Sequence, residues 1–304
     1  MICPRKGSSM EPMPYRLVGE HEFYCCGSRV LIKDGKIKVL TEPKITYCPL
    51  HESLYGIKKL DKTAVKRSVK LKAKKSGFCC EHRIFDDSMV VPYGSTEVMS
   101  VCLKRGLLDC AVTVCDGAGT VIASNPNLVQ AIGARLTGII KTSPIVSNIQ
   151  YIKSNSGIVL DEETAKIDQC RGVIKAAELG FRRIAVTVAG LNSAQIEPIR
   201  RAEREMNTEV SVFSVCNTCA DEADIERILA GADIACASAS RLMRERIGPK
   251  ALLQVGVVIP VFALTRHGKN LLLSYLMESN EKLVAFRTRK MPYIVQGKGP
   301  KLRK

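Results

Sequence analysis

The sequence contains no tryptophan, and aromatic residues make up only 5% of its 304 residues. It also lacks any run of 18 or more apolar residues, which excludes an ordinary transmembrane helix. The opening residues, MICPRKGSSMEPMPYR, contain no apolar segment like the core of a secretory signal, so we expect a cytoplasmic protein. Because aromatic residues are scarce and no recognition motif is visible, a nucleic-acid partner is disfavoured.

Acidic residues are absent from the C-terminus, where residues 282–304 contain eight Lys and Arg. Residues 1–80 contain 17 Lys and Arg against seven acids, so the net charge of +16 belongs to the two ends of the chain. A basic helix is predicted over residues 61–75, either as a solvated helix over a sheet or as a surface for a polyanion or an anionic partner. The charge distribution is compatible with an acidic protein partner that docks at the ends.

Four histidines are few, but thirteen cysteines are many for a chain that is too large to need disulfide bonds. The segments Cys48-Pro-Leu-His51 and Cys79-Cys80-Glu-His82 each place thiols and an imidazole within a few positions. Zinc prefers four such ligands, and iron–sulfur clusters prefer thiolates. The candidate metal ligands, for zinc or an iron–sulfur cluster, are therefore Cys48, His51, Cys79, Cys80 and His82. A reactive thiol pair and buried structural cysteines are the alternatives.

Hydrophobic periodicity predicts an α/β fold, with a mainly parallel sheet and flanking helices in Rossmann-like layers after a small N-terminal β-hairpin and helix subdomain. The hairpin is predicted over residues 28–40, around Asp34-Gly35. Later strands are expected near residues 107–117, 182–190, 208–216, 232–238 and 255–265. Helices are expected near residues 94–106, 126–140, 161–179, 193–206, 221–230 and 268–278, and from Ser240. The predicted domains are a flexible leader (1–20), a Cys/His-rich β and helix subdomain (21–90), an α/β domain (91–286) and a basic flexible tail (287–304).

Polar loops follow several predicted strands, at the edge where parallel sheets bind their ligands. In the segment from Cys115 to Thr120, Cys115 and Asp116 are candidate catalytic residues, and three further residues are candidate ligand-binding residues: Gly117, Gly119 and Thr120. Two later loops supply hydroxyls, cations and a candidate catalytic imidazole: Ser238, Ser240, Arg241, Thr265, Arg266 and His267. They suit an anionic small molecule or cofactor. The alternative is ordinary turns, helix caps and solvated loops.

Cys216-Asn-Thr-Cys219 follows another predicted strand and precedes a helix, which is typical of a redox pair or a metal pair. A second such pair is missing from the α/β part. The sequence also lacks a G-x-G-x-x-G fingerprint, a P-loop, an H-E-x-x-H motif and a Ser-His-Asp order. No specific reaction follows from these motifs.

Four stretches resemble a known family: YCPL at 47–50, LLDCAVTVCDGAGTVI at 107–122, NPNLVQAIGARLTGIIKTSPI at 125–145 and VLDEETAKIDQCRGVIKAAELGFRRIAVTVA at 159–189. Together they are similar to the methanogenesis marker protein eight family, a domain of unknown function, and the likeness covers roughly residues 22–275. The resemblance implies an archaeal protein linked to methanogenesis. The Cys25-Cys26 doublet and the basic tail look peripheral to the family pattern.

These observations lead to two functional expectations. The first is an enzyme or maturation factor that acts on a methanogenic cofactor or metalloenzyme, with the strand-end loops holding an anionic molecule and the N-terminal thiols holding a metal or handling sulfur. The alternative is a non-catalytic accessory or assembly protein whose basic ends dock an acidic protein partner.

Overall fold

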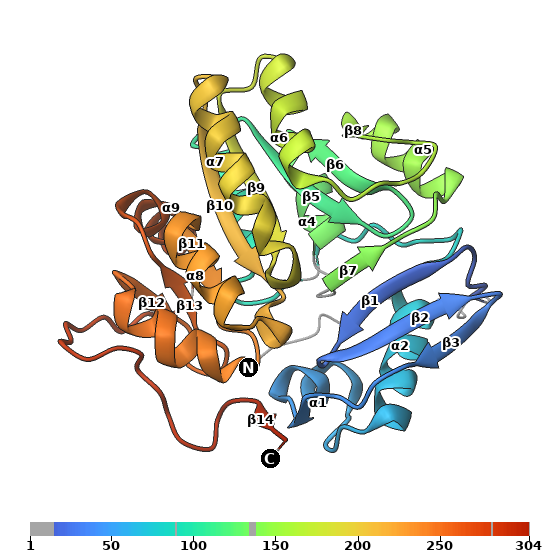
Figure 1. Cartoon of the computed structure of the whole chain (residues 1–304), viewed down its shortest axis with the longest axis horizontal. Coiled ribbons are helices and arrows are strands. Elements are labelled where there is room, and N and C mark those ends of the chain that lie inside the picture. Colours follow the sequence, from blue (N-terminus) through green and yellow to red (C-terminus); the bar gives the residue numbers. More distant parts are fainter. Residues whose placement is uncertain (1–14, 89, 134–137, 281, 304) are drawn as a thin grey trace.

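The computed structural model describes residues 15–88, 90–133, 138–280 and 282–303. Its larger part is an eight-stranded sheet in the order β12-β13-β11-β10-β9-β5-β6-β8, with helices on both faces (Figure 1). A four-stranded sheet in the order β3-β2-β1-β7 lies beside it. The predicted α/β class, with a small N-terminal sheet and helix before the main sheet, is confirmed.

The strands of the large sheet are short and mostly apolar. They are β5 Cys110–Cys115, β6 Gly119–Ala123, β8 Gly157–Val159, β9 Arg183–Ala189, β10 Glu209–Val215, β11 Ile234–Cys236, β12 Leu253–Val255 and β13 Val261–Ala263. The helices around it are α3 Ser95–Lys104, α4 Pro126–Gly133, α5 Val146–Ser154, α6 Gln169–Glu178, α7 Ile196–Glu205, α8 Glu222–Gly231 and α9 Arg266–Met277. Short helical turns cover Gly190–Gln195, Asn217–Cys219, Met243–Ile247 and Gly248–Lys250. Across the described part of the chain, no helix is both long enough and apolar enough to cross a membrane.

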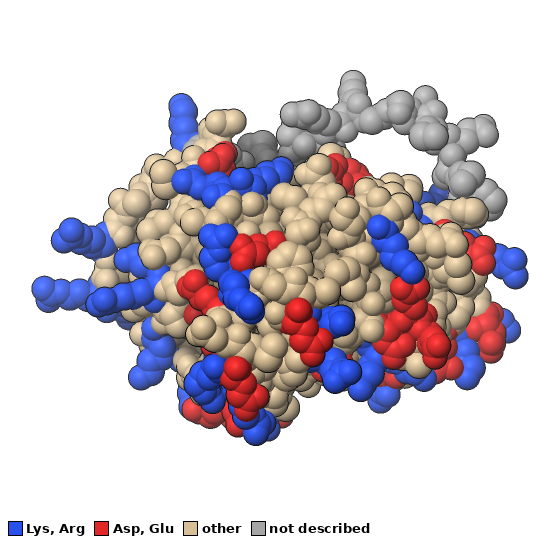
Figure 2. All heavy atoms as spheres, turned by 90° about the horizontal axis from the view of Figure 1, so that it is seen from above, with Lys and Arg blue, Asp and Glu red and all other residues tan. Residues whose placement is uncertain are grey.

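Strand direction confirms that the large sheet is mainly parallel. The four central strands, β11, β10, β9 and β5, run parallel to one another. Strands β13 and β6 run antiparallel to their inner neighbours, and β12 and β8 reverse direction again. Six of the eight strands therefore point the same way, so their carboxyl ends meet at one edge of the sheet. Figure 2 shows acidic and basic side chains interspersed over most of the face in view, with mainly basic side chains at its left margin.

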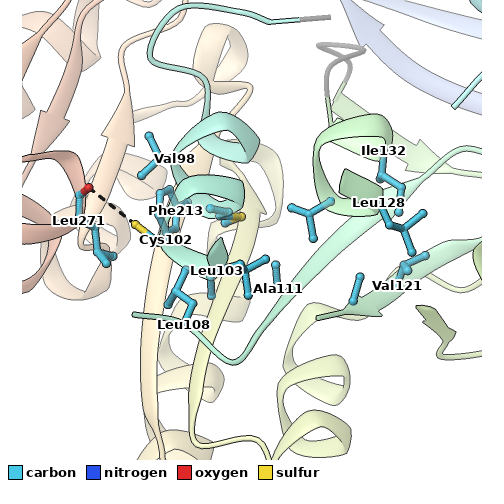
Figure 3. Packing of buried hydrophobic residues seen from close by; sticks show 14 of the residues in the cluster. Val98, Cys102, Leu103, Leu108, Ala111, Val121, Leu128, Ile132, Phe213 and Leu271 are labelled. Carbon is cyan, nitrogen blue, oxygen red and sulfur yellow. Dashed lines mark hydrogen bonds between the residues drawn. The ribbon is translucent and has the colours of Figure 1, made fainter. Parts of the chain in front are cut away.

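Each face of the large sheet has its own apolar core because successive strand residues point to opposite faces. Cys110 and Val112 of β5 pack with helices α6, α7 and α8, whereas Ala111 packs with α3, α4 and α9. Figure 3 shows the core on the side of α3, α4 and α9. In it, the Cys102 thiol donates a hydrogen bond of 3.8 Å to the carbonyl oxygen of Leu271. The continuous apolar strands seen in the sequence are explained by this two-sided burial.

The small sheet consists of antiparallel strands: β1 His21–Cys25, β2 Ser28–Lys33, β3 Lys36–Val39 and β7 Gly138–Lys141. The predicted hairpin is confirmed, with positive φ angles at Asp34 and Gly35 between β2 and β3. Helix α2, Lys62–Ser76, begins where the Asp61 side chain accepts a hydrogen bond from the amide of Ala64. Its one apolar stripe packs on the sheet: Val65, Val69 and Ala73.

Several predicted boundaries differ from the structure. The helix predicted over 126–140 ends at Gly133, and β7 follows as a strand of the small sheet; residues 134–137 lie outside the described residues. The helix predicted over 161–179 begins only at Gln169, after its Asp168 cap. The predictions missed β6, α5 and β8, and also the short helix at Pro49–Tyr55. Strand β7 pairs with β1 from more than a hundred residues away, which local periodicity cannot indicate.

The described C-terminal residues reach the N-terminal part of the molecule (Figure 1). Strand β14, Lys301–Leu302, pairs antiparallel with β4, Ile45–Tyr47, and the Arg303 amide donates to the Lys44 carbonyl at 2.9 Å. Helix α1, Pro49–Tyr55, starts directly after β4. The end of the basic tail therefore supports the segment that leads to His51.

Candidate metal centre

Cys25, Cys26 and His51 lie together, with one ligand atom from each within 4.8 Å of the others. Nε2 of His51 is 3.1 Å from Sγ of Cys26 and 3.9 Å from Sγ of Cys25. Within the described ranges, this is the one group of at least three His, Cys, Asp or Glu side chains with such spacing. The residues come from the end of β1 and from α1, so the centre is built where two separate segments meet.

The turn between β1 and β2 explains how two adjacent cysteines approach one imidazole. Neighbouring residues of a strand point to opposite faces, which would separate the two thiols. Cys26 and Gly27 form a two-residue turn in which both φ angles are positive, at 54° and 77°. Such turns favour Asn-Gly, so Cys26 holds a left-handed conformation that is costly for its residue type. Backbone strain of this kind is concentrated at functional sites.

Helix α1 positions the other side of the centre. Cys48 occupies the N-cap position, but its side chain makes no capping hydrogen bond. Pro49 fixes the first turn of the helix, and His51 follows within that turn. The buried Cys48 thiol packs in the same apolar cluster as Cys26, and the influence of His51 lowers its pKa. The Cys48 thiol is therefore available as a fourth ligand, in addition to Cys25, Cys26 and His51.

The charges of the centre favour a thiolate beside a cationic imidazole. A hydrogen bond from Cys26 places the pKa of Cys25 well below its usual value, against the effect of burial, and His51 and Lys72 also lower it. Burial acts to lower the pKa of His51, but Cys25 and Cys48 raise it to about 9. Burial acts to raise the pKa of Cys48, yet His51 lowers it overall. The thiolate is the form in which cysteine binds a metal ion.

The centre borders the carboxyl edge of the large sheet. The Cys219 thiol, in the turn after β10, donates to the carbonyl oxygen of Gly27 at 3.8 Å. Ala239, in the loop after β11, packs in the same apolar cluster as Cys48. Cys216, at the same carboxyl edge, has a left-handed φ of 55°, so a second cysteine with a strained backbone lies at this edge. The centre thus faces the loops where an open α/β sheet binds its ligands.

The five residues predicted as metal ligands occupy two separate places. Cys48 and His51 belong to the centre, whereas Cys79 and Cys80 lie in the apolar core of the small sheet. Burial raises the pKa of both, and that of Cys80 reaches about 12. His82 is exposed. The prediction omitted Cys25 and Cys26, although a cysteine at the turn position where asparagine is usual was a signal in the sequence.

The predicted loop from Cys115 to Thr120 makes its polar contacts within the protein. Asp116 is 2% exposed and pairs with the fully buried Arg83, with 3.1 Å between Nε and Oδ1. Its other oxygen accepts from the amide of Cys79 at 2.8 Å, and Arg83 donates to Sγ of Cys115 at 2.6 Å. Thr120 donates to the Gln169 side chain at 2.8 Å. A catalytic or ligand-binding role for this loop stays a prediction, and no pattern in the sequence indicated that Arg83 would be its partner.

Gly119 in this loop has a structural requirement that can be measured. Its φ is 69°, and a Cβ at this position would overlap the backbone carbonyl of Ala165. We expect Gly119→Ala to lower the free energy of unfolding by about 3 kcal/mol or more, because overlap adds to a conformational cost of about 1–2 kcal/mol. Gly180→Ala is the control, since Gly180 has a φ of 94° and open space around it. Equal losses in urea unfolding would contradict the role of the overlap.

The remaining predicted residues at the carboxyl edge of the large sheet make local contacts with neighbouring loops and helical turns. Oγ of Ser238 accepts from the amide of Asn217 at 3.0 Å, and Oγ of Ser240 accepts from the amide of Met243 at 3.2 Å. Arg241 is exposed and pairs with Glu245 in the next helical turn. Burial raises the pKa of Cys216 to about 12 and also raises that of Cys219. Their roles as ligand-binding or redox residues stay predictions.

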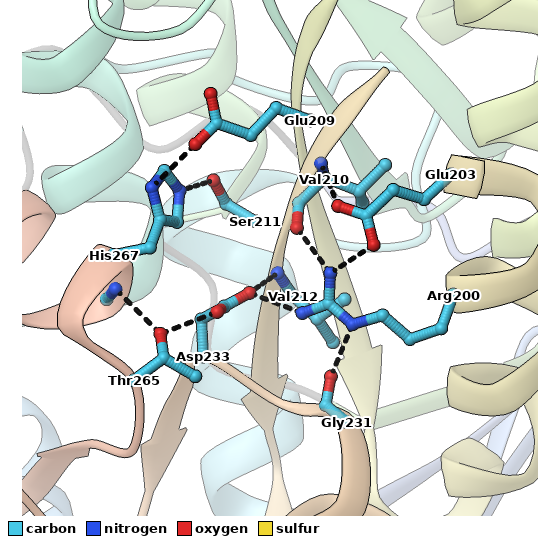
Figure 4. Close-up of polar contacts among 11 residues, drawn as sticks. Arg200, Glu203, Glu209, Val210, Ser211, Val212, Gly231, Asp233, Thr265 and His267 are labelled. Atoms are coloured by element: carbon cyan, nitrogen blue, oxygen red, sulfur yellow. Dashed lines mark hydrogen bonds and ion pairs between the residues drawn. The ribbon is translucent and has the colours of Figure 1, made fainter. Parts of the chain in front are cut away.

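The predicted placement of the last loop at this ligand-binding edge was wrong: Thr265, Arg266 and His267 lie at the opposite edge, because β13 runs against the parallel strands. Nδ1 of His267 is 2.9 Å from Glu209, and Nε2 is 2.6 Å from Oγ of Ser211 (Figure 4). Thr265 donates to Asp233 at 2.6 Å. A histidine that contacts a serine hydroxyl and a carboxylate is the arrangement that activates a serine nucleophile. Here, however, Ser211 is fully buried in β10. No substrate can reach that hydroxyl in this structure.

Comparisons with known proteins show a family match and a similar archaeal protein. Residues 21–277 match the family described as "Uncharacterized protein conserved in archaea (DUF2099)". The chain is also 38% identical over 259 residues to Uncharacterized protein MJ0054 of Methanocaldococcus jannaschii, covering 85% of this chain and 90% of that protein. The matched family region includes Cys25, Cys26, Cys48 and His51 and ends before the basic tail.

Proposed function

The chain belongs to this archaeal family, and we propose that it is a zinc-thiolate protein whose centre is formed by Cys25, Cys26, Cys48 and His51. The observation that carries the proposal is the convergence of two adjacent thiols on one imidazole at a strained turn. The centre would serve an enzyme or maturation factor that acts on a cofactor or metalloenzyme of methanogenesis, a link that rests on the resemblance of the sequence. Free thiols in this number suit the reducing cytoplasm.

The spacing of the donor atoms supports a single zinc ion. Ligand atoms bound to zinc at about 2.0–2.3 Å in a tetrahedron lie about 3.3–3.8 Å apart. The distances from Nε2 of His51 to the two thiols, 3.1 and 3.9 Å, bracket this range. An iron–sulfur cluster interposes inorganic sulfide and several irons between its thiolates, so donors this close favour one ion over a cluster.

The chemistry of the ligand set gives the residues their roles. Three thiolates and an imidazole form the usual set of a closed zinc site, which contributes to folding. With Cys25, Cys26 and His51 alone, the ion would keep one position for a substrate or partner ligand. Cys48 would then decide between the two states, because it lies next to His51 but outside the tightest group.

Cys26→Asn tests the proposal without breaking the hairpin. Asparagine is favoured at this turn position, so we expect the variant to fold while its zinc content falls from about one ion per chain to near zero. The measurement is elemental analysis of anaerobically purified protein, with circular dichroism as the test of folding.

Cys170→Ala is the matched control, because Cys170 is a half-buried thiol of α6 outside the centre. It should keep the zinc of the wild type. Wild-type protein that folds but takes up no zinc would overturn the proposal. Zinc that persists in Cys26→Asn and is lost from Cys80→Ala would move the centre to the second cysteine group.

The second candidate is an accessory protein that docks an acidic partner. The observation in its favour is the acid-free end of the chain, residues 282–304, of which the described part is largely exposed. The docking hypothesis predicts that partner subunits co-purify with the chain and that fewer remain bound as the salt concentration rises, whether or not Cys26 is replaced. The zinc-thiolate proposal predicts metal binding by the isolated chain.

A further inference from the structure

A groove of about 990 Å³ lies at the other end of the small sheet from the metal centre. Cys25 pairs with Ser28 at one end of the β1–β2 ladder, and the groove adjoins its opposite end, where His21 pairs with Ile32. Three segments form its walls: residues 15–20, the hairpin residues 33–38, and Lys66 and Lys70 of α2. The first wall is held in place because Leu17 packs in the core and the Val18 amide donates to Cys79.

The walls of the groove carry a marked excess of positive charge. The cations are Arg16, Lys33, Lys36, Lys38, Lys66 and Lys70, and the acids are Glu20 and Asp34. Glu20 is already paired with Lys33 at 2.9 Å and with Lys141 at 3.1 Å. Among the residues that the structure describes, no ion pair joins the other five cations to an acid. Their combined field in a concave surface attracts anions.

The arrangement of these lysines runs against ordinary structural preferences. Lys66 and Lys70 are one helical turn apart, and Lys33 lies directly opposite Lys36 in the β2–β3 ladder. Like charges in both relations are destabilising. Lysines on β3 also protect an exposed sheet edge, which accounts for Lys36 and Lys38. Edge protection does not account for the cations that α2 and residues 15–20 direct at the same space.

We infer that this groove binds a small-molecule polyanion of cofactor size that carries phosphate or carboxylate groups. The volume lies at the upper end of the range for ligand pockets, far above what a single inorganic ion needs. The chain upstream of the groove does not supply the counter-charge, since residues 1–14 contain Arg5, Lys6 and only one acid, Glu11. The inference is independent of the metal centre, because the two sites share no residue.

Calorimetric titration of the full chain with sodium tripolyphosphate tests the inference. At about 0.15 M salt, where charges beyond about 8 Å are screened, the wild type should bind one equivalent. Lys66→Glu/Lys70→Glu should weaken binding at least about tenfold, because both reversed charges face the groove. Arg67→Glu/Lys74→Glu makes the same change of charge on the same helix outside the groove, and should alter the affinity less than about threefold.

Three results would overturn the inference. One is wild-type protein that does not bind tripolyphosphate, and another is an equal loss of affinity in the two double variants, which would indicate diffuse surface charge. The third is displacement of tripolyphosphate by phosphatidylserine vesicles or single-stranded DNA at equal phosphate concentration, which would assign the surface to a membrane or a nucleic acid. All variants keep the cysteines and His51, so zinc content should be unchanged and failure of one site leaves the other intact.

Discussion

Zinc loading should raise the free energy of unfolding by about 4 kcal/mol when free zinc is about 1,000 times its dissociation constant. The gain is expected because the ligands come from β1 and from the segment after β4, so the ion joins two segments that separate on unfolding. In a chain of 304 residues the gain corresponds to a rise in Tm of roughly 6 °C, because the unfolding entropy grows with chain length. Thermal unfolding of apo and zinc-loaded protein under anaerobic conditions measures it.

Cys26→Asn provides the control for the zinc effect. Its apo form should be at least as stable as the apo wild type, because asparagine suits the left-handed turn better than cysteine. Zinc should not change its Tm. A similar rise in Tm in Cys26→Asn and in wild type would show that zinc stabilises the fold from elsewhere.

Arg83→Met should lower the free energy of unfolding by about 3–5 kcal/mol, since removing one partner leaves the other charge buried and unpaired. Both side chains are almost completely inaccessible, and Asp116 would keep only the hydrogen bond from the Cys79 amide. The loss should be large because Arg83 also donates to the carbonyl oxygen of Ile132 in α4 and to Sγ of Cys115 in β5, which ties the segment after α2 to the large sheet and one of its helices. Urea unfolding at neutral pH measures the change.

Two further variants separate charge burial from simple loss of an arginine. Arg246→Met removes an exposed pair with Glu222 and Glu226 and should have a far smaller effect. Adding Asp116→Asn to Arg83→Met should restore part of the lost stability, because the neutral amide removes the unpaired charge. If Arg83→Met and Arg246→Met were equally mild, the buried pair would not be a major support of the fold.

The sequence by itself determined the features that depend on local pattern. The alternation around Asp34-Gly35 determined the β2–β3 hairpin, and the spacing of Val65 and Val69 determined which face of α2 is buried. Continuous apolar strands separated by amphipathic helices determined the α/β layers. Cys48 and His51 could be named as ligand candidates because they lie within one short segment.

The tertiary structure alone decided which of these features meet. Cys25 and Cys26 join His51 only because the turn between β1 and β2 faces helix α1, and short-range spacing does not encode that approach. The direction of β13, which moved His267 to the opposite edge, depends on its pairing with β11. The partner of Asp116 lies 33 positions earlier in the chain, at Arg83. Local sequence limits which backbone conformations each segment adopts, whereas contacts between distant segments are chosen by the burial and charge pairing of the whole chain.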